Sequence, residues 1–464
     1  MTKKIELRGH PASFRDRDGF LYTRDGVLVR QVNLAYAPHY DLLLESGLYD
    51  RLVQDGSLIR HREIDEPGMI PEKAYKVIEP DQLEFISYPY EWCFSQLKEA
   101  ALATLNTQKQ ALEMGMSLKD ASAYNIQFRA ARPVLIDSLS FVRYQSGQPW
   151  IAYRQFCQHF LAPLALMAHT DVRLGRLLRS YLDGIPLDLA SRLLPWHTRL
   201  RGGLMIHIHL HSSMQRRAAR GKGGNSKPRG AMSRQGMLGI IDSLQRAIES
   251  LNWEPEHTEW SDYSNVHNYS DTAFEQKRQA VQEFVAEVAP RTVWDLGANT
   301  GLFSRLASSR GISTIAFDLD PGAVELNYRK CRQDPDSSLL PLLLDLTNPS
   351  PSQGWALQER QSLVERGPAE GVLALALIHH LAIGNNVPLG PVAEFLSKLG
   401  SHQLVEFVPK DDPQIQRMLI SREDIFEDYS LKGFERAFEK YFDVRRRTSV
   451  GDSGRVLYWL DRRV

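Results

Sequence analysis

The segment Val293–Ser304, with the sequence VWDLGANTGLFS, constrains the fold more than any other part of the chain. It begins as a short apolar strand, passes through a turn with two glycines, and continues as the start of a helix. Gly297, Ala298 and Gly301 are small enough to let a ligand approach the backbone, and Asp295 lies near the end of the strand. This succession is typical of the first strand, turn and helix of a doubly wound α/β sheet, which binds ligands at the carboxyl ends of its strands. The segment therefore predicts an α/β domain with a ligand site at this turn.

Four more apolar runs follow at the spacing expected when strands alternate with helices. They cover residues 312–318, 340–345, 371–380 and 402–408. The first two of these runs end in Asp318 and Asp345. An acid after the second strand is placed to accept hydrogen bonds from both hydroxyl groups of a ribose. In the tail, aromatic residues and two apolar segments predict a final helix and an antiparallel hairpin.

This arrangement resembles the class I, seven-stranded S-adenosylmethionine methyltransferases over residues 239–464. Nicotinamide oxidoreductases are the alternative, but they favour G-x-G-x-x-G, and here Asn299 stands at the second glycine position. The resemblance implies that S-adenosyl-L-methionine is the cofactor. The cofactor-binding residues that it implies are Asp295, Gly297, Ala298, Asn299, Gly301, Asp318 and Asp345. Residues 377–381 and 405–410 also resemble bacterial methyltransferases with a long N-terminal extension, including rhizobial host-specificity nodulation proteins.

The length and charge of the chain limit the number of domains and the kinds of partner to expect. Its 464 residues exceed what one hydrophobic core usually supports, so a second domain is expected before the glycine turn. The charges of the 56 basic and 56 acidic residues cancel, so the net charge of the chain does not indicate a nucleic-acid or membrane-surface partner. Three scattered cysteines without C-x-x-C spacing argue against a disulfide framework or a zinc site, and no apolar run reaches the length of a membrane span. We therefore expect a cytoplasmic protein.

The front half, residues 1–212, carries a second pattern. Asp120 is followed five positions later by Asn125, and Asp137 closes an apolar strand. This spacing resembles the catalytic and metal-binding loops of the protein-kinase and aminoglycoside-phosphotransferase fold. The resemblance implies that Asp120 handles the acceptor hydroxyl, while Asn125 and Asp137 hold magnesium on nucleotide phosphates.

Several residues depart from the kinase pattern. Leu118 replaces the histidine two residues before the catalytic acid, Ser138 follows Asp137, and no glycine-rich phosphate loop is present near the N-terminus. Arg30 stands where a phosphate-pairing lysine is expected, and arginine is not an equivalent replacement. We therefore favour an α+β kinase-like domain that has lost phosphoryl transfer and recruits an acceptor. An ATP- and magnesium-binding regulatory or bifunctional protein is the alternative, and an unrelated α+β domain is a second one.

Residues 213–238 predict a basic, glycine-rich linker between the two domains. Their arginines, lysines and glycines, without aromatic residues, cannot build a core. We favour a solvated hinge. The alternative is an arm that binds RNA phosphates, which makes the protein an RNA methyltransferase, although single-stranded binders usually add stacking aromatics.

The chemistry predicts further candidates on the acceptor side. Methyl transfer from a sulfonium needs no metal, and holding the acceptor in line with the methyl carbon supplies most of the acceleration. A hydroxyl or protonated amine acceptor also needs a general base. His380 is our preferred base and His379 the second candidate, because both follow the fourth strand. Alternatively, they only shape the cofactor's methionine end. Glu406 and Lys410 are candidates for orienting a polar substrate, unless Glu406 pairs with a neighbouring cation. The acceptor itself, a small molecule or a protein, is not readable from the sequence.

A segment before the glycine turn combines aromatic residues with a lysine. These residues are Trp260, Tyr263, Tyr269 and Lys277. They predict either a lid that stabilises a sulfonium through cation–π contacts or ordinary packing, and we favour packing.

Overall fold

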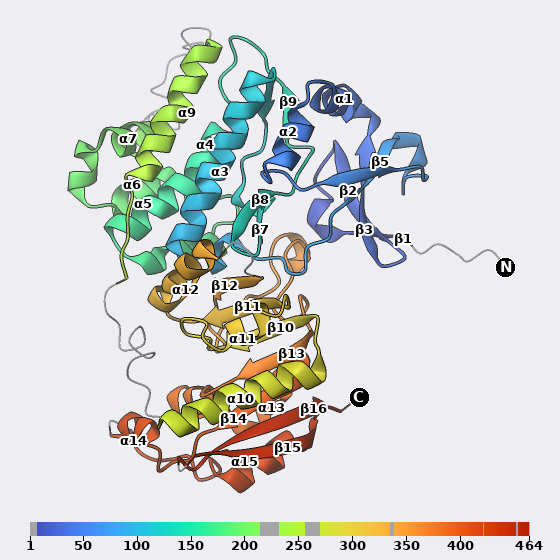
Figure 1. The fold of residues 1–464 in the computed structure, drawn as a ribbon. Coiled ribbons are helices and arrows are strands. Elements are labelled where there is room, and N and C mark those ends of the chain that lie inside the picture. Colours follow the sequence, from blue (N-terminus) through green and yellow to red (C-terminus); the bar gives the residue numbers. More distant parts are fainter. Residues whose placement is uncertain are drawn as a thin grey trace, which may run out of the picture. The chain divides into compact units, whose positions relative to one another are not determined.

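The computed structural model describes residues 7–213, 232–255, 270–334, 338–420, 422–451 and 453–463 (Figure 1). The chain divides into two compact units. Unit 1 comprises residues 1–253 and 353–360, and unit 2 comprises residues 254–352 and 361–464. Within the described ranges, no helix has both the length and the apolar character needed to cross a bilayer.

Unit 2 is built on a seven-stranded sheet. Its strands are β10 (Thr292–Leu296), β11 (Ser313–Asp318), β12 (Leu339–Leu343), β13 (Ala369–Ala374), β14 (Gly400–Phe407), β15 (Phe442–Val450) and β16 (Arg455–Arg462). They lie in the order β12-β11-β10-β13-β14-β16-β15. The first five are parallel, and β16 is antiparallel to both of its neighbours. This order reverses direction at β10, which confirms the predicted doubly wound sheet and places the glycine turn at its switch point.

Helices pack on both faces of this sheet. The unit contains α10 (Asp271–Val288), α11 (Ser304–Ser308), α12 (Pro321–Gln333), α13 (Leu389–Leu399), α14 (Pro413–Leu419) and α15 (Leu431–Phe438). Phe284 of α10 packs in one core with Leu404 of β14 and Trp459 of β16. Phe407, an odd number of residues from Leu404, packs against Phe434 of α15. Because side chains alternate across a strand, α10 and α15 cover opposite faces.

The fourth strand is shorter than predicted. The apolar run 371–380 predicts one continuous strand, but β13 ends at Ala374. Ala376 has a φ of 50°, a left-handed conformation that breaks the extended backbone. His379 and His380 therefore lie in the short helical turn that follows, in which the π-helix η11 covers His380–Gly384. Apolarity alone does not separate a buried strand from a buried helical turn.

Unit 1 begins with a five-stranded antiparallel sheet in the order β1-β2-β3-β5-β4. Its strands are β1 (Leu7–Gly9), β2 (Gly19–Arg24), β3 (Val27–Asn33), β4 (His61–Ile64) and β5 (Ala74–Pro80), with helices α1 (Ala37–Glu45) and α2 (Leu48–Gln54). Two hairpin-like pairs follow the long helix α3 (Phe94–Glu113): β6 (Met116–Leu118) with β9 (Phe141–Arg143), and β7 (Ile126–Arg129) with β8 (Arg132–Leu135). Unit 1 therefore combines a small antiparallel sheet with helices, in an α+β arrangement.

The remaining helices of unit 1 include one that was predicted for the other domain. They are α4 (Tyr153–Phe156), α5 (Ala162–His169), α6 (Leu187–Leu193), α7 (Gly202–Leu204) and α9 (Arg234–Glu249). Helix α9 packs against α3, and Lys98 on α3 donates to the backbone oxygens of Glu249 and Leu251 at 3.0 and 2.7 Å. The compact units therefore do not divide at the expected boundary between residues 238 and 239. Of the predicted linker, residues 214–231 lie outside the described ranges.

Candidate functional site

The turn after β10 is closed by backbone hydrogen bonds to the neighbouring strand. The amides of Gly297 and Ala298 both donate to the carbonyl oxygen of Phe317 on β11, each at 2.9 Å. Gly297 and Gly301 both have a φ of +76°, which glycine adopts without strain. A Cβ added to Gly301 would lie 2.5 Å from the Asn327 side chain. The glycines are thus required by the backbone path, and the turn has a single well-defined shape.

Asp318 joins this turn to the second strand. One carboxylate oxygen accepts the backbone N–H of Asn299 at 2.7 Å, and the other accepts that of Asp320 at 2.9 Å. Burial raises the pKa of Asp318, and these two backbone donors oppose that rise. The acid therefore lies at the carboxyl end of β11 beside the glycine turn. Each carboxylate oxygen has further lone pairs that can accept a ribose hydroxyl.

Asp295 lies beneath the turn and is almost completely buried, with an exposed fraction of 2%. Its carboxylate accepts the hydroxyl of Ser304, the first residue of α11, at 2.6 Å. Burial raises its pKa to about 6, although the Ser304 hydrogen bond and the positive charge of Lys277 act in the opposite direction. Asp345, after β12, accepts the backbone N–H and the hydroxyl of Thr347 at 2.9 and 2.6 Å and shapes the next turn.

The two candidate histidines lie side by side. Their ring centres are 4.1 Å apart. His379 is buried, and its Nδ1 has no hydrogen-bond partner among the described residues. Burial, followed by the charges of His380, Arg455 and Lys277, holds the pKa of His379 well below its ordinary value. Burial also lowers the pKa of the half-buried His380. Both rings are therefore neutral near pH 7, where a neutral imidazole is able to accept a proton.

Glu406 pairs with neighbouring cations, which is the alternative to a role in orienting the substrate. It is fully buried on β14, and its Oε2 lies 2.6 Å from Lys277 Nζ of α10. Its Oε1 lies 3.4 Å from Arg455 of β16, and Arg455 also pairs with Asp412 at 2.7 Å. We call these four residues the buried ion cluster. A carboxylate held between two buried cations is committed to them, so a role in orienting the substrate does not follow from this geometry.

Lys410 lies apart from this cluster. Its ammonium group pairs with both carboxylate oxygens of Asp424, at 2.7 and 2.9 Å. Of the predicted lid, Lys277 is in the cluster, whereas Trp260, Tyr263 and Tyr269 lie outside the described ranges.

Several residues at this site were not among the candidates named from the sequence. Arg305 of α11 donates to the carbonyl oxygens of Thr300 and Gly301 at 2.7 and 2.9 Å, and to the side chain of Asn327 at 2.8 Å. It therefore fastens the glycine turn to α12. Arg455 was not a candidate, and Lys277 was expected in a lid or in packing and not in an ion pair, because their partner Glu406 is far away in sequence. A cation on an amphipathic helix such as α10 is a weak signal for a buried ion pair.

In unit 1, the predicted residues Arg30, Asn125 and Asp137 lie close together, and Arg30 forms an ion pair with Asp137. Arg30 of β3 contacts Asp137 at 2.5 Å and Asp16 at 2.8 Å, and its exposed fraction is 8%. Burial alone would raise the pKa of Asp137, but Arg30 and a hydrogen bond from Ser140 hold it below its ordinary value. Asn125 contacts the same Ser140 hydroxyl at 3.4 Å. The Asp137 carboxylate is thus already neutralised by the arginine at the lysine position.

Asp120 lies at the start of the same loop. It accepts the backbone N–H of Ser122 at 2.9 Å, which is an ordinary turn interaction. Burial raises its pKa.

A short segment of the β12–β13 connection belongs to unit 1. Residues 353–360 form a tight loop in which Gln353 and Arg360 pair as an antiparallel bridge. The Arg360 guanidinium lies 4.5 Å from the centre of the Tyr124 ring, next to Asn125, and Gln353 donates to the carbonyl oxygen of Arg179 at 2.6 Å. Trp355, in the same loop, is 70% exposed.

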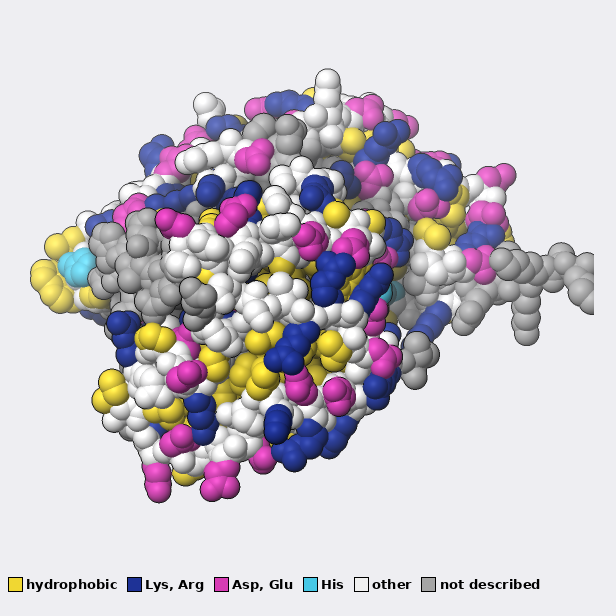
Figure 2. Space-filling model, turned by 60° about the horizontal axis from the view of Figure 1, so that its bottom comes forward, with side chains coloured by type: hydrophobic (Ala, Val, Ile, Leu, Met, Phe, Trp, Pro, Cys, Tyr) yellow, Lys and Arg dark blue, Asp and Glu magenta, His cyan; other side chains and the backbone are white. Residues whose placement is uncertain are grey.

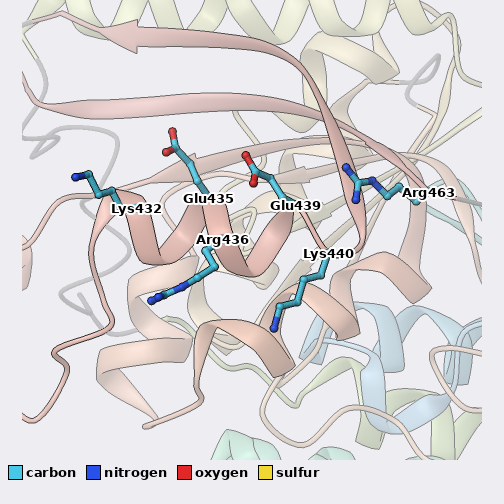
Figure 3. A pocket seen from close by; sticks show the side chains of 6 residues that line it. All are labelled: Lys432, Glu435, Arg436, Glu439, Lys440 and Arg463. Carbon is cyan, nitrogen blue, oxygen red and sulfur yellow. The ribbon is translucent and has the colours of Figure 1, made fainter.

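Figure 3 shows a surface hollow of about 510 Å³ on unit 2 that is separate from these residues. It is lined by charged side chains of both signs: Lys432, Glu435, Arg436, Glu439, Lys440 and Arg463. None of the predicted cofactor residues lines it. Every side chain that lines it is charged, whereas ligand pockets are lined mainly by hydrophobic and aromatic side chains, so we do not assign it to the site.

Known proteins resemble this chain in sequence and in structure. No family model matches the chain. The nodulation protein NoeA of Rhizobium meliloti (strain 1021) is 36% identical over 458 residues, which are 97% of this chain and 95% of NoeA. Among solved structures, the magnesium protoporphyrin IX methyltransferase ChlM of Synechocystis PCC 6803, with bound SAH, is 13% identical to this chain. The match covers 41% of this chain and 84% of the ChlM chain, with a TM-score of 0.30. The bifunctional kinase-methyltransferase WbdD is 16% identical over 41% of this chain and 40% of its own, with a TM-score of 0.29.

The strand order and the turn geometry of unit 2 identify its fold. The sheet order, the antiparallel β16 and the glycine turn beside Asp318 are those of class I methyltransferases. The NoeA match extends over both units. Unit 2 therefore has the class I methyltransferase fold, and the chain belongs to the NoeA family.

Proposed function

We propose that unit 2 transfers a methyl group from S-adenosyl-L-methionine to a small-molecule or protein acceptor that unit 1 recruits. The observation that carries this proposal is the junction of the glycine turn with Asp318, where the Asn299 amide lies 2.7 Å from the carboxylate. A turn with left-handed glycines leaves room for a nucleoside, and the acid beside it offers acceptors to a ribose. The residues present therefore fit the cofactor.

Each predicted residue has a role that its position supports. Asp318 would bind the ribose hydroxyls and Asp345 would lie on the adenine side. Asp295 would favour the cationic methionine end through its charge. The cofactor supplies the methyl group, so the chain needs only to orient the acceptor and remove its proton.

His380 remains our preferred base. It is half-buried, so an acceptor can reach it more easily than the buried His379. The unpartnered Nδ1 of His379 is better suited to hold a ligand by a hydrogen bond, since a buried polar atom without a partner is costly.

We expect methyl-labelled cofactor incubated with fractionated cell extract to label one class of acceptor, and the Asp295→Ala variant to lose this activity. The loss should be about tenfold or more, because an ionised hydrogen-bonding group contributes about 1.5–3 kcal/mol. Scintillation counting of metabolite, protein and RNA fractions measures it. Asp443→Ala is the matched control, because Asp443 is an exposed acid paired with Arg463. Equal labelling by wild type and Asp295→Ala would contradict the proposal.

A regulatory ATP- and magnesium-binding protein is the second candidate, and the ion pairs of Arg30 speak against it. An arginine that already contacts Asp137 and Asp16 competes with magnesium for the same carboxylates. We expect calorimetry to detect no magnesium-dependent ATP binding. The Asp137→Ala variant should behave like wild type in this titration. Binding by wild type that disappears in Asp137→Ala would instead support the second candidate.

An RNA methyltransferase is the third candidate, and it depends on the basic linker. The structure describes only part of this segment, so its support remains the composition of residues 214–236. On the face shown in Figure 2, Lys and Arg side chains are interspersed with Asp and Glu side chains. A solvated face with mixed charge, together with the zero net charge of the chain, does not favour phosphate binding.

A further inference from the structure

We infer that unit 1 docks on the surface of membranes that contain anionic lipid, through exposed apolar side chains flanked by arginines. These side chains, which we call the apolar surface of unit 1, are those of Leu193, Trp196, Leu200, Met205, Ile206 and Leu210. The contact is peripheral, with the side chains inserting at the level of the lipid headgroups. This inference goes beyond the proposed methyl transfer, which concerns unit 2, and does not depend on it.

The apolar surface of unit 1 is formed by three elements that follow one another in the chain. Leu193 ends α6, and the other five residues lie on η8 (Trp196–Leu200) and η9 (Met205–Leu210), where η9 packs against both α6 and η8. All six side chains are at least 39% exposed, and those of Trp196 and Leu200 are 73% and 76% exposed. Figure 2 shows hydrophobic side chains beside a histidine at its left edge, the side on which Figure 1 places α6 and α7. Single exposed apolar residues are ordinary, whereas such a concentration marks an interaction site.

The polarity of η9 is inverted, with histidines inside and apolar residues outside. His207 and His209 are buried, and their four ring nitrogens lie 2.7–3.0 Å from the hydroxyl groups of Tyr153, Ser243, Ser191 and Thr198. Turning the apolar face of η9 inward would break these four hydrogen bonds and leave buried polar atoms without partners, which is costly. The hydrogen bonds of the histidines therefore hold Ile206 and Leu210 on the outside.

The charge of the surrounding sequence has one sign. Between Asp188 and Asp242 the chain has ten basic residues and no acidic residue, although the net charge of the whole chain is zero. Arg199 and Arg201 are exposed on either side of Leu200, and neither forms an ion pair with another described residue. A bilayer with anionic lipid complements both properties of this region, because its acyl boundary accepts apolar side chains and its headgroups attract arginines.

A hollow of about 440 Å³ between α7 and α9 adjoins the apolar surface of unit 1. Arg201, which follows Leu200 in the chain, lines it together with Arg246 of α9, and no acidic side chain of the described residues lines it. A Cβ added to Gly203 would lie 2.6 Å from the Cβ of Ala247, so this glycine lets α7 approach α9 closely. Two guanidinium groups in one hollow attract an anion, and a lipid phosphate is the anion at the depth of the inserted side chains.

Two other occupants fit these observations less well. A nucleic acid would bind the arginines through its phosphates and would stack its bases on aromatic rings, but it gains little from exposed leucine and isoleucine side chains. A second copy of the chain would cover the apolar side chains. In a two-fold interface, however, the same surface of both copies meets, so their arginines would face one another.

The test is co-sedimentation of the full-length protein with vesicles of phosphatidylglycerol and phosphatidylcholine in equal parts. Wild type should bind these vesicles about tenfold or more tightly than vesicles of phosphatidylcholine alone, and added salt should weaken the binding. Trp196→Ser combined with Leu200→Ser should lose about tenfold or more in affinity, because it removes two inserting side chains. Arg201→Gln combined with Arg246→Gln should also lose about tenfold or more, because it removes two charges near the headgroups.

Two matched double variants serve as controls. Ile420→Ser combined with Ile425→Ser removes two exposed apolar side chains of unit 2 and should bind the vesicles like wild type. Arg436→Gln combined with Arg463→Gln removes two arginines from the hollow of mixed charge and should also bind like wild type. All of the apolar substitutions are at exposed positions, and circular dichroism compares the fold of each variant with that of wild type.

Three results would overturn the inference. The first is a wild type that ignores the mixed vesicles, or a Trp196→Ser, Leu200→Ser variant that binds them as wild type does. The second is binding of an oligouridine RNA without binding of vesicles, which would assign the arginines to a nucleic acid. The third is a dimer in sedimentation velocity that this double variant dissociates, again without binding of vesicles, which would assign the apolar surface of unit 1 to a second copy of the chain.

Discussion

Replacing Glu406 with alanine should lower the free energy of unfolding of unit 2 by about 3–5 kcal/mol, the usual cost of breaking a buried ion pair from one side. Glu406 is fully buried, and its carboxylate contacts Lys277 at 2.6 Å and Arg455 at 3.4 Å. Without it, Lys277 and Arg455 both lose a buried carboxylate contact, whereas Arg455 keeps Asp412. The weaker compensation of the buried Lys277 ammonium group is the main source of the loss.

Hydrogen exchange of the amides in β14 and β16 under denaturant measures this change in unit 2. Glu394→Ala is the matched control, because its ion pair with Lys398 is exposed and should contribute less than about 0.5 kcal/mol. Lys277→Met combined with Glu406→Leu should recover much of the loss, since it replaces the pair with apolar groups. A Glu406→Ala variant as stable as the Glu394→Ala control would show that the cluster does not stabilise the sheet.

Replacing Asp318 with alanine should weaken S-adenosyl-L-methionine binding between about tenfold and about a hundredfold, the range for losing a hydrogen bond to a charged group. The change removes the proposed ribose acceptor and also frees the Asn299 amide, which now donates to Asp318 at 2.7 Å. Asn299 has a φ of 51°, so this hydrogen bond also helps hold a backbone conformation that few residues adopt.

Calorimetric titration at about pH 8, well above the ordinary pKa range of carboxyl groups, isolates this effect from protonation. Asp318→Asn keeps one acceptor oxygen and should lie between wild type and Asp318→Ala. The exposed Asp443→Ala variant should bind like wild type. Unchanged affinity in Asp318→Ala would remove the acid from the proposed site.

The fold of unit 2 was predictable because its signals are local. A left-handed glycine turn after a short apolar strand has few alternatives, and each later parallel strand coincides with an apolar run, of which the first two end in an acid. The ends of the elements were less predictable. The run 371–380 is continuous in hydrophobicity, yet the backbone leaves the strand at Ala374 and carries His379 and His380 into a helical turn.

Only the tertiary structure decided which distant segments are in contact. Lys277, Glu406 and Arg455 lie on three separate elements, and each by itself reads as an ordinary amphipathic or strand residue. Likewise, α9 and residues 353–360 join unit 1 through packing against α3 and Tyr124, which no local pattern marks. The sequence by itself determined the glycine turn and the alternation of strands and helices, because backbone sterics and hydrophobic periodicity act between near neighbours. Which buried charges meet was decided by the folded chain, because a side chain's electrostatic partner depends on distance in space and on the exclusion of water.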